Sequence, residues 1–305
     1  MSHGDPLGVE MDRAKQVLRG LAGESVDAIE VKSLSSEEAP FLGQVVSKLS
    51  PMIGNLLEAR LIQVLDEGAH PDLHWRRQDP DFPDAALFDK LGRALGAGFE
   101  VKAWYALSTE LTGRFRESQN LLAARDVHVV VIAWVMSHIV YGTPQILDVL
   151  IVPAKQVAAA RDAHYHRPPD YLILEPGDTS ARTRNLQQTN VAGYKWQETT
   201  AGKVADAQKL MRGYARKPNA PHSPVEQEMA KALISAFNYR LDTNFAKIDR
   251  IDDEDIEAFK SKVLAMTAHG RTMKDWAKLL RDLNSDNAET SARAAKRMQQ
   301  IYAAL

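Results

Sequence analysis

The chain contains 305 residues, which suits one large domain or a domain of about 200 residues with an appendage. Hydrophobic residues make up 45% of it and charged residues 26%, as in an ordinary globular protein. Cysteine is absent, which excludes disulfides and cysteine zinc sites, so any metal must bind to oxygen or imidazole. No apolar run is long enough to span a membrane and the N-terminus does not resemble a signal peptide, so we expect a cytoplasmic protein without membrane attachment.

The net charge of −2 at pH 7 is not typical of a protein that coats nucleic acid. The charge is segregated, however. Residues 175–217 contain eight Lys or Arg and four Asp or Glu, a balance of +4, and the remainder of the chain carries −6. Any affinity for nucleic acid is therefore expected to come from this local segment.

The N-terminal part predicts helices and one strand. Residues 11–21 have helical spacing, and residues 27–34 have the pattern of a strand that contains Glu30-Val31-Lys32. Helical spacing returns over residues 40–67, where Pro51 is expected to divide the segment into two helices. A polar loop is expected next.

After that loop, which covers residues 70–81, the stretch FPDAALFDKLGRALGAGFEVKAWY at residues 82–105 predicts two strands with a Gly-containing connection. Glu100 and Lys102 are two positions apart on the second strand, so their side chains point to the same face. Asp84, at the start of the first strand, can join them. Two carboxylates and an amine at a sheet edge can hold a hard cation beside a basic group, which phosphodiester hydrolysis requires.

The next segments predict the rest of a sheet. Residues 108–125 have helical spacing despite Gly113, and residues 128–135 are almost all apolar and β-branched, as in a strand covered on both faces. Further strands are expected at residues 146–152 and 171–174. This order of elements predicts an α/β fold with a mixed central sheet flanked by helices.

The segment from residue 176 to 200 is rich in side chains that can read bases. Arg pairs with guanine, and Asn or Gln pairs with adenine, through two hydrogen bonds in the major groove. We therefore predict contacts with double-stranded DNA, within a recognition segment of about residues 176–217, from Arg182, Arg184, Asn185, Gln187, Gln188, Asn190, Lys195 and Gln197. The alternative is a polar loop that meets only water.

The C-terminal part predicts helices. They are expected at residues 252–268, 272–283 and 288–305, and their buried side chains are expected to include Phe259 and Trp276. We expect residues 1–220 to form a core with the recognition segment, and residues 221–305 to form a helical region for packing, dimerisation or DNA support.

The spacing of the acidic and basic residues resembles a known family. Pro83-Asp84, fifteen further residues and then Glu100-Val101-Lys102 resemble the signature of the PD-(D/E)XK phosphodiesterase superfamily. The best-known members of this superfamily are the type II restriction endonucleases. The resemblance implies a restriction-endonuclease-like core and covers about residues 55–200, so the C-terminal helical part lies outside it.

The resemblance also implies roles for individual residues. Asp84 and Glu100 are expected to coordinate Mg²⁺ with the carbonyl oxygen of Val101 and water, and Lys102 to orient or deprotonate the attacking water. Nucleases of this family often place a glutamate from a preceding helix near the metal, which makes Glu58 a further candidate ligand. The alternative for Glu58 is a position on a polar helix face.

A type II restriction endonuclease is the expected function, because the chain has a size that suits both recognition and cleavage and its readout-like segment follows the catalytic core. No phosphate-binding loop for a nucleotide cofactor is present, which argues against a motor enzyme. Such enzymes commonly act as homodimers on palindromic sites, so we expect a homodimer. Two alternatives remain: a structure-specific repair or recombination nuclease, and a sequence-specific DNA-binding protein without hydrolysis. Asp81 and Asp89 compete as site acids, and the triplet Glu30-Val31-Lys32 lacks a preceding Pro-Asp, which favours a solvated strand face.

Overall fold

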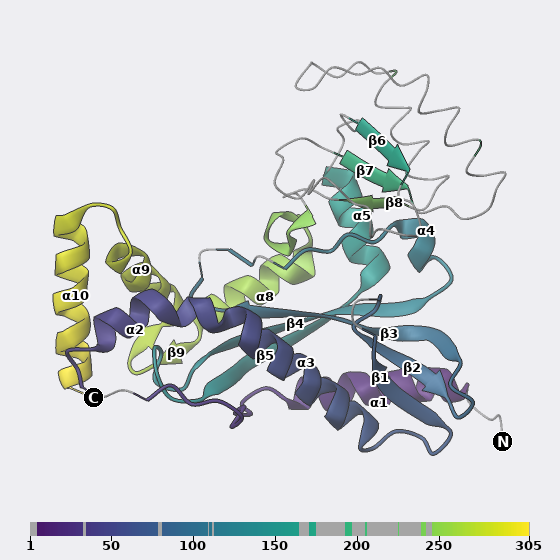
Figure 1. Cartoon of the computed structure of the whole chain (residues 1–305), viewed down its shortest axis with the longest axis horizontal. Helices are drawn as coiled ribbons and strands as arrows, with labels where there is room; N and C mark the ends of the chain where they lie inside the picture. The colour runs from purple at the N-terminus through teal and green to yellow at the C-terminus, as the bar shows by residue number, and fades with distance from the viewer. Residues whose placement is uncertain are drawn as a thin grey trace. The chain divides into compact units, whose positions relative to one another are not determined.

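In a computed structural model of the whole chain, the protein separates into two compact units (Figure 1). The first unit contains Met1–Leu111, His128–Val152 and Glu254–Leu305, and the second contains Thr112–Val127 and Pro153–Asp253. The structure describes residues 5–32, 35–78, 81–108, 110–111, 113–164, 171–174, 193–196, 205, 225, 239–241 and 246–304. The domain boundary expected at residue 220 remains a prediction, because it lies outside the described residues.

A five-stranded sheet with the order β1-β2-β3-β4-β5 forms the centre of the first unit. Its strands are β1 (Leu73–Arg77), β2 (Ala85–Asp89), β3 (Ala94–Tyr105), β4 (Asp126–Met136) and β5 (Pro144–Pro153). β1, β2 and β3 are antiparallel neighbours. β3 and β4 run in the same direction, because Phe99 lies beside His128 and the Ala106 N–H donates to Trp134 O farther along both chains. The sheet is therefore mixed, and the predicted α/β fold class is confirmed.

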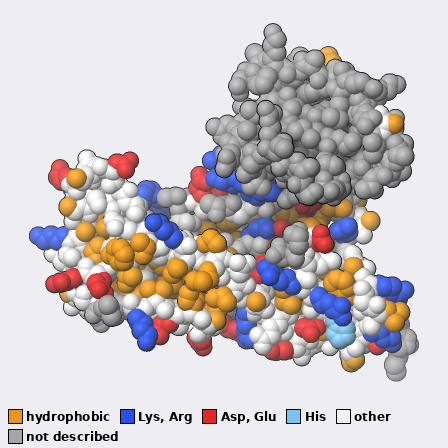
Figure 2. All heavy atoms as spheres, viewed as in Figure 1, with side chains coloured by type: hydrophobic (Ala, Val, Ile, Leu, Met, Phe, Trp, Pro, Cys, Tyr) orange, Lys and Arg blue, Asp and Glu red, His pale blue; other side chains and the backbone are white. Residues whose placement is uncertain are grey.

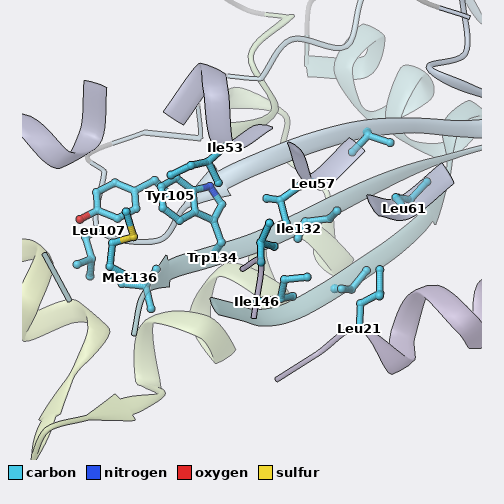
Figure 3. Packing of buried hydrophobic residues seen from close by; sticks show 14 of the residues in the cluster. Leu21, Ile53, Leu57, Leu61, Tyr105, Leu107, Ile132, Trp134, Met136 and Ile146 are labelled. Atoms are coloured by element: carbon cyan, nitrogen blue, oxygen red, sulfur yellow. The ribbon is translucent and has the colours of Figure 1, made fainter. Parts of the chain in front are cut away.

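The N-terminal part forms helices, and α3 among them covers one face of this sheet. They are α1 (Pro6–Gly20), α2 (Ala39–Val45), the 3₁₀ turn η1 (Val46–Leu49) and α3 (Ser50–Asp66). α3 contacts β1 and β3. Figure 3 shows Ile53, Leu57 and Leu61 of α3 packed together with Ile132 and Trp134 of β4, all of which are fully buried. This core is explained by the buried residues that recur every four positions on α3 and by the continuous apolar run of β4.

A buried carboxylate ties α1 to the sheet. Glu10 accepts hydrogen bonds from the Arg13 guanidinium, from Trp75 Nε1 at 2.8 Å and from the His70 N–H at 3.2 Å. Burial alone would raise the pKa of Glu10, but the bonds from Arg13 and Trp75 outweigh it and hold the pKa below its ordinary value of 4.5. Glu10 is therefore a structural acid that is satisfied by its neighbours.

The C-terminal helices belong to the first unit. They are α8 (Glu254–Ala265), α9 (Met273–Leu283) and α10 (Ala288–Ala303), and a hairpin of β9 (Thr267–Ala268) and β10 (Arg271–Thr272) connects the first two. Phe259 of α8 lies against Trp104 of β3, and Trp276 of α9 is fully buried, as expected. A Cβ on Gly43 of α2 would lie 2.9 Å from Leu280, so α2 and α9 pack closely. The predicted helical C-terminal region is confirmed.

One surface of the first unit is apolar. Figure 2 shows hydrophobic side chains gathered over the region of α2 and α3, and the exposed ones include Phe41, at 64% exposure, and Met52, at 47%. Among the residues that the structure describes, no helix is both long and apolar enough to cross a membrane.

The second unit contains a separate small sheet. β6 (Tyr171–Leu174) pairs in parallel with β7 (Gly193–Trp196), and β7 pairs with β8 (Tyr239–Leu241) in the antiparallel sense. The second unit also contains α4 (Gln119–Leu122), α5 (Ala154–His164) and the 3₁₀ turn η4 (Ile248–Arg250). The strand expected at residues 171–174 is confirmed, but it belongs to this sheet and not to the central one.

Three local expectations are wrong. Residues 108–125 do not form one helix, because Phe115 N–H donates to Ala246 O and Ile248 N–H donates to Gly113 O, which hold this segment extended. Residues 27–32 form no strand and make only an isolated bridge, at Val31. The expected loop at residues 70–81 contains β1, which pairs with β2 along its whole length.

Candidate active site

The site begins where β2 begins. Asp84 immediately precedes β2, and its backbone carbonyl accepts a hydrogen bond from Gln78 N–H at 3.0 Å, so it continues the pairing with β1. Its side chain accepts from the Val101 N–H, with 2.7 Å between Oδ2 and N. The Asp84 carboxylate therefore crosses from the start of β2 to the middle of β3, and its position is set from both strands.

Gly98 of β3 allows this close approach. A Cβ at this position would meet the Ala85 carbonyl oxygen and would lie 2.5 Å from Pro83 Cγ. The backbone around Asp84 can lie against β3 only because Gly98 carries no side chain. The spacing of the charged residues does not reveal the role of Gly98, although a glycine inside a strand pattern is a signal for close backbone approach.

Glu100 and Lys102 project from the same face of β3 and meet Asp84. Lys102 Nζ lies 2.6 Å from Glu100 Oε1 and 3.7 Å from Asp84 Oδ2. The two carboxylate oxygens are therefore separated by no more than these two distances combined. The side chains of Asp84, Glu100 and Lys102 are 20%, 15% and 14% exposed, so the group is half-buried but open to solvent. The structure brings together the three residues that the sequence predicted.

The backbone of Val101 faces the same group. In an antiparallel pair the N–H and C=O of one residue point toward the same neighbouring strand. Because the Val101 N–H donates to Asp84, its carbonyl oxygen also points to the β2 side of β3. Two carboxylates and a carbonyl oxygen are the donors that Mg²⁺ uses, and water normally completes its octahedron. The chemistry of this donor set fits Mg²⁺.

Glu58 lies apart from these donors. It projects from α3, the helix that packs against the opposite face of the sheet, and its Oε1 lies 2.5 Å from Arg77 Nε of β1. Within the described residues, no group of three or more His, Asp or Glu side chains is arranged to hold a metal ion. The acids that the structure places together are thus Asp84 and Glu100, and Glu58 is engaged with Arg77.

The competing acids have other surroundings. Asp89 closes the β2–β3 turn, because its carboxylate accepts from the N–H groups of Leu91 and Arg93, each at 2.9 Å. The bond from the Arg93 backbone lowers the pKa of Asp89 below its ordinary value. Asp81 is exposed in the loop before Asp84, and both Glu30 and Lys32 are exposed. The second triplet is thus solvated, as predicted, although it is not in a strand.

The predicted DNA-contacting residues are not tested by this geometry. Lys195 lies in β7, of which only the backbone is described, and the other seven predicted contacts lie outside the described residues. They remain predictions. The described site of Asp84, Glu100 and Lys102 lies wholly in the first unit.

Comparison of the chain with family models, with curated proteins and with solved structures finds no match.

Proposed function

We propose that this chain is a Mg²⁺-dependent endodeoxyribonuclease, and specifically a type II restriction endonuclease that cuts double-stranded DNA at a specific palindromic sequence. The observation that supports it best is the half-buried group of Asp84, Glu100 and Lys102 around a single ammonium position. These residues have the spacing that resembles the PD-(D/E)XK signature, and the antiparallel pairing of β2 with β3 explains why such a spacing brings them together.

The side chains divide the chemistry between them. Asp84, Glu100 and the carbonyl oxygen of Val101 are the groups that would hold Mg²⁺. When bound, Mg²⁺ polarises the scissile phosphate and lowers the pKa of a coordinated water. Lys102 Nζ lies beside both carboxylates, so it is placed to orient the attacking water. Bound Mg²⁺ would favour the neutral amine of Lys102, and that form could accept the proton of the water.

Recognition and assembly belong to the same proposal. Bases are read by the polar side chains between Arg182 and Gln197, and two copies act together, since a twofold protein matches a twofold sequence. The exposed apolar side chains of Phe41 and Met52 provide a surface on which a second copy can pack. Light scattering measures the molar mass in solution of the purified chain and of Phe41→Glu. We expect the unaltered chain to be a dimer, and we expect Phe41→Glu to weaken the association of its two copies.

Plasmid digestion tests the function directly. Purified protein is incubated with supercoiled plasmid with Mg²⁺ and with EDTA, and the ends of all fragments are sequenced. We expect discrete fragments with one common end sequence, and only with Mg²⁺. A smear or nicks at branched structures would favour the repair nuclease, and intact plasmid with specific binding would leave only the DNA-binding protein.

Glu100→Ala is the test variant, and Glu30→Ala, from the solvated triplet, is its matched control. We expect the first variant to lose cleavage while it still binds DNA, because a cation ligand is removed and the DNA-contacting segment is untouched. The second should cleave like the unaltered protein. Full cleavage by Glu100→Ala would show that the site assignment is wrong.

A further inference from the structure

Arg76 shares a face of the sheet with the proposed site. It lies opposite Ala86 in the β1–β2 pair, and Ala86 lies opposite Gly98 in the β2–β3 pair. Residues directly opposite one another project to the same face, and residues two apart on one strand do the same. Arg76 therefore projects to the face that bears Asp84 and Glu100, which is called the site face below.

Arg76 and Asp84 are close neighbours on the site face. Asp84 is the diagonal neighbour of Arg76, a relation that places Cα atoms about 7–8 Å apart. Ala86, which lies between them along β2, carries only a methyl group, and Gln78, which lies between them along β1, donates its N–H to the Asp84 carbonyl oxygen. Gly98, opposite Ala86 on β3, adds no side chain. An Arg side chain is long enough to reach a neighbouring phosphate of a DNA strand that lies on this face.

The Arg76 guanidinium is held over an aromatic ring. Its Cζ lies 5.4 Å from the centroid of Phe88, and Arg76 is exposed. Its NH1 lies 4.0 Å from where a Cβ on Gly92 would stand, so the guanidinium leans toward the β2–β3 turn and away from Asp84. A phosphate bound there is therefore a different phosphate from the one at Asp84 and Glu100.

Charge distinguishes Arg76 from its neighbours. Arg77, the next residue, points to the opposite face and pairs with Glu58, and Arg93 pairs with Asp89. Within the described part of the chain, no acid forms an ion pair with Arg76. Its positive charge is thus presented to solvent beside the site and is held by a ring that does not neutralise it.

We propose that Arg76 binds a backbone phosphate next to the scissile phosphate on the same strand, and that Phe88 positions its guanidinium. The inference rests on the proposed DNA substrate, and it adds a subsite that fixes the register of the strand on the site face. Contacts of this kind are independent of base sequence, because phosphates are the same at every position. Arg76 is a substrate-binding residue in this proposal and takes no part in the chemistry.

Arg76→Ala and Arg77→Ala form a matched pair for the test, since they remove adjacent guanidiniums from opposite faces of one strand. Binding to a labelled random-sequence duplex is measured by fluorescence anisotropy in EDTA over a series of salt concentrations. We expect Arg76→Ala to bind about tenfold more weakly and to reduce the slope of log K against log salt by about 1 unit. Arg77→Ala should leave the slope unchanged.

Two further variants separate charge from position. Arg76→Lys should keep the slope, because it keeps the charge, and Phe88→Leu should weaken binding less than Arg76→Ala, because the guanidinium is retained but is less well held. Circular dichroism and Tm confirm that each variant is folded. An unchanged slope for Arg76→Ala, or equal losses for Arg76→Ala and Arg77→Ala, overturns the inference.

The plasmid experiment keeps this test apart from the proposed function. If the plasmid is cut but Arg76→Ala binds normally, the phosphate subsite is wrong and the nuclease proposal stands. If Arg76→Ala loses one unit of slope but the plasmid remains intact, Arg76 binds DNA and the nuclease proposal fails. No binding of the duplex by the unaltered chain overturns the inference.

Discussion

The tripeptide Glu-Val-Lys occurs twice in this chain, and the two copies have different surroundings. Glu100 and Lys102 are half-buried, contact each other at 2.6 Å and share Asp84. Glu30 and Lys32 are exposed, and Val31 between them makes an isolated bridge with Gly142. The same Glu and Lys side chains thus belong to a compact ionic group in one place and to a solvated surface in the other.

The difference lies in the neighbouring strand and not in the tripeptide. Asp84 reaches the second copy because β2 pairs with β3 and Gly98 lets the two backbones approach. In a half-buried group the effective dielectric constant is lower than in water, so like carboxylates gain more from a shared cation. A short charged motif becomes a candidate site only where the fold adds a further acid and removes water.

The largest expected effect is the loss of cleavage rate on substitution of Lys102, and Lys32 of the other Glu-Val-Lys copy is its control. Lys102→Ala should reduce the rate of plasmid cleavage by about 10²–10⁴-fold, the usual range for a group that transfers or orients a proton. Lys32→Ala should leave the rate unchanged. Initial rates with Mg²⁺ at matched protein concentration provide the measurement, and equal rates for the two variants would contradict the assignment.

Gly98→Ala tests the contact between strands on which the comparison depends. Its new Cβ would meet the Ala85 carbonyl oxygen, so we expect the free energy of unfolding to fall by about 1–3 kcal/mol and cleavage to fall with it, as Asp84 is displaced. Gly54→Ala on α3 is the control. Its Cβ would lie 3.5 Å from Ala103, an ordinary contact, so stability should hold or rise by up to about 1 kcal/mol. Urea denaturation measures both changes.

Glu10→Gln contrasts a structural acid with the acids of the site. We expect it to lower the free energy of unfolding by about 1–3 kcal/mol at pH 7, because the bonds from Arg13 and Trp75 favour the ionised carboxylate. Cleavage per folded molecule should not change.

The pH dependence of Glu10 has a definite sign. Its pKa in the folded chain lies below the ordinary 4.5, so the folded state holds its proton less tightly than the unfolded chain. The stabilisation is complete above pH 4.5 and is lost as the pH falls through the lower, folded pKa. Unfolding curves of the unaltered chain and Glu10→Gln should therefore converge in acid. A difference that grows in acid would refute this.

The smallest expected effect is at Asp89, the acid at the other end of the β2–β3 hairpin. Asp89→Ala removes the bonds to the Leu91 and Arg93 N–H groups of an exposed turn, so Tm should fall by less than in Gly98→Ala. Cleavage should be retained. Loss of cleavage at normal Tm would mean that Asp89, and not Asp84, belongs to the site.

Several elements could be read from the sequence, because their signals are local. The β-branched run of β4 predicted a strand buried on both faces, and every residue from Val127 to Met136 is buried. The amphipathic spacing of α9 and α10 predicted both helices, and Thr272 and Asn287 cap their N-termini. The spacing of Asp84, Glu100 and Lys102 predicted that they meet, since a hairpin brings its two strands together.

The remaining elements depend on distant partners. β1 forms because Trp75 stacks on Phe99 at 5.2 Å and because its N–H donates to the Asp66 side chain. Residues 113–115 lie in a segment, 108–125, that has helical spacing, but they are extended. The reason is that residues 246–248 pair with them, more than a hundred positions farther along the chain. Spacing along the chain does not encode such pairings.

The sequence by itself determined the mixed α/β class, the buried strand, the C-terminal helices and the residues that could form an ionic site. Only the tertiary structure decided that Gly98 lets β2 approach β3, that Glu58 pairs with Arg77, and that Arg76 shares the face of Asp84. The physical reason is range: backbone propensity and side-chain periodicity act over a few residues, whereas charge, burial and strand register depend on contacts made when the whole chain packs.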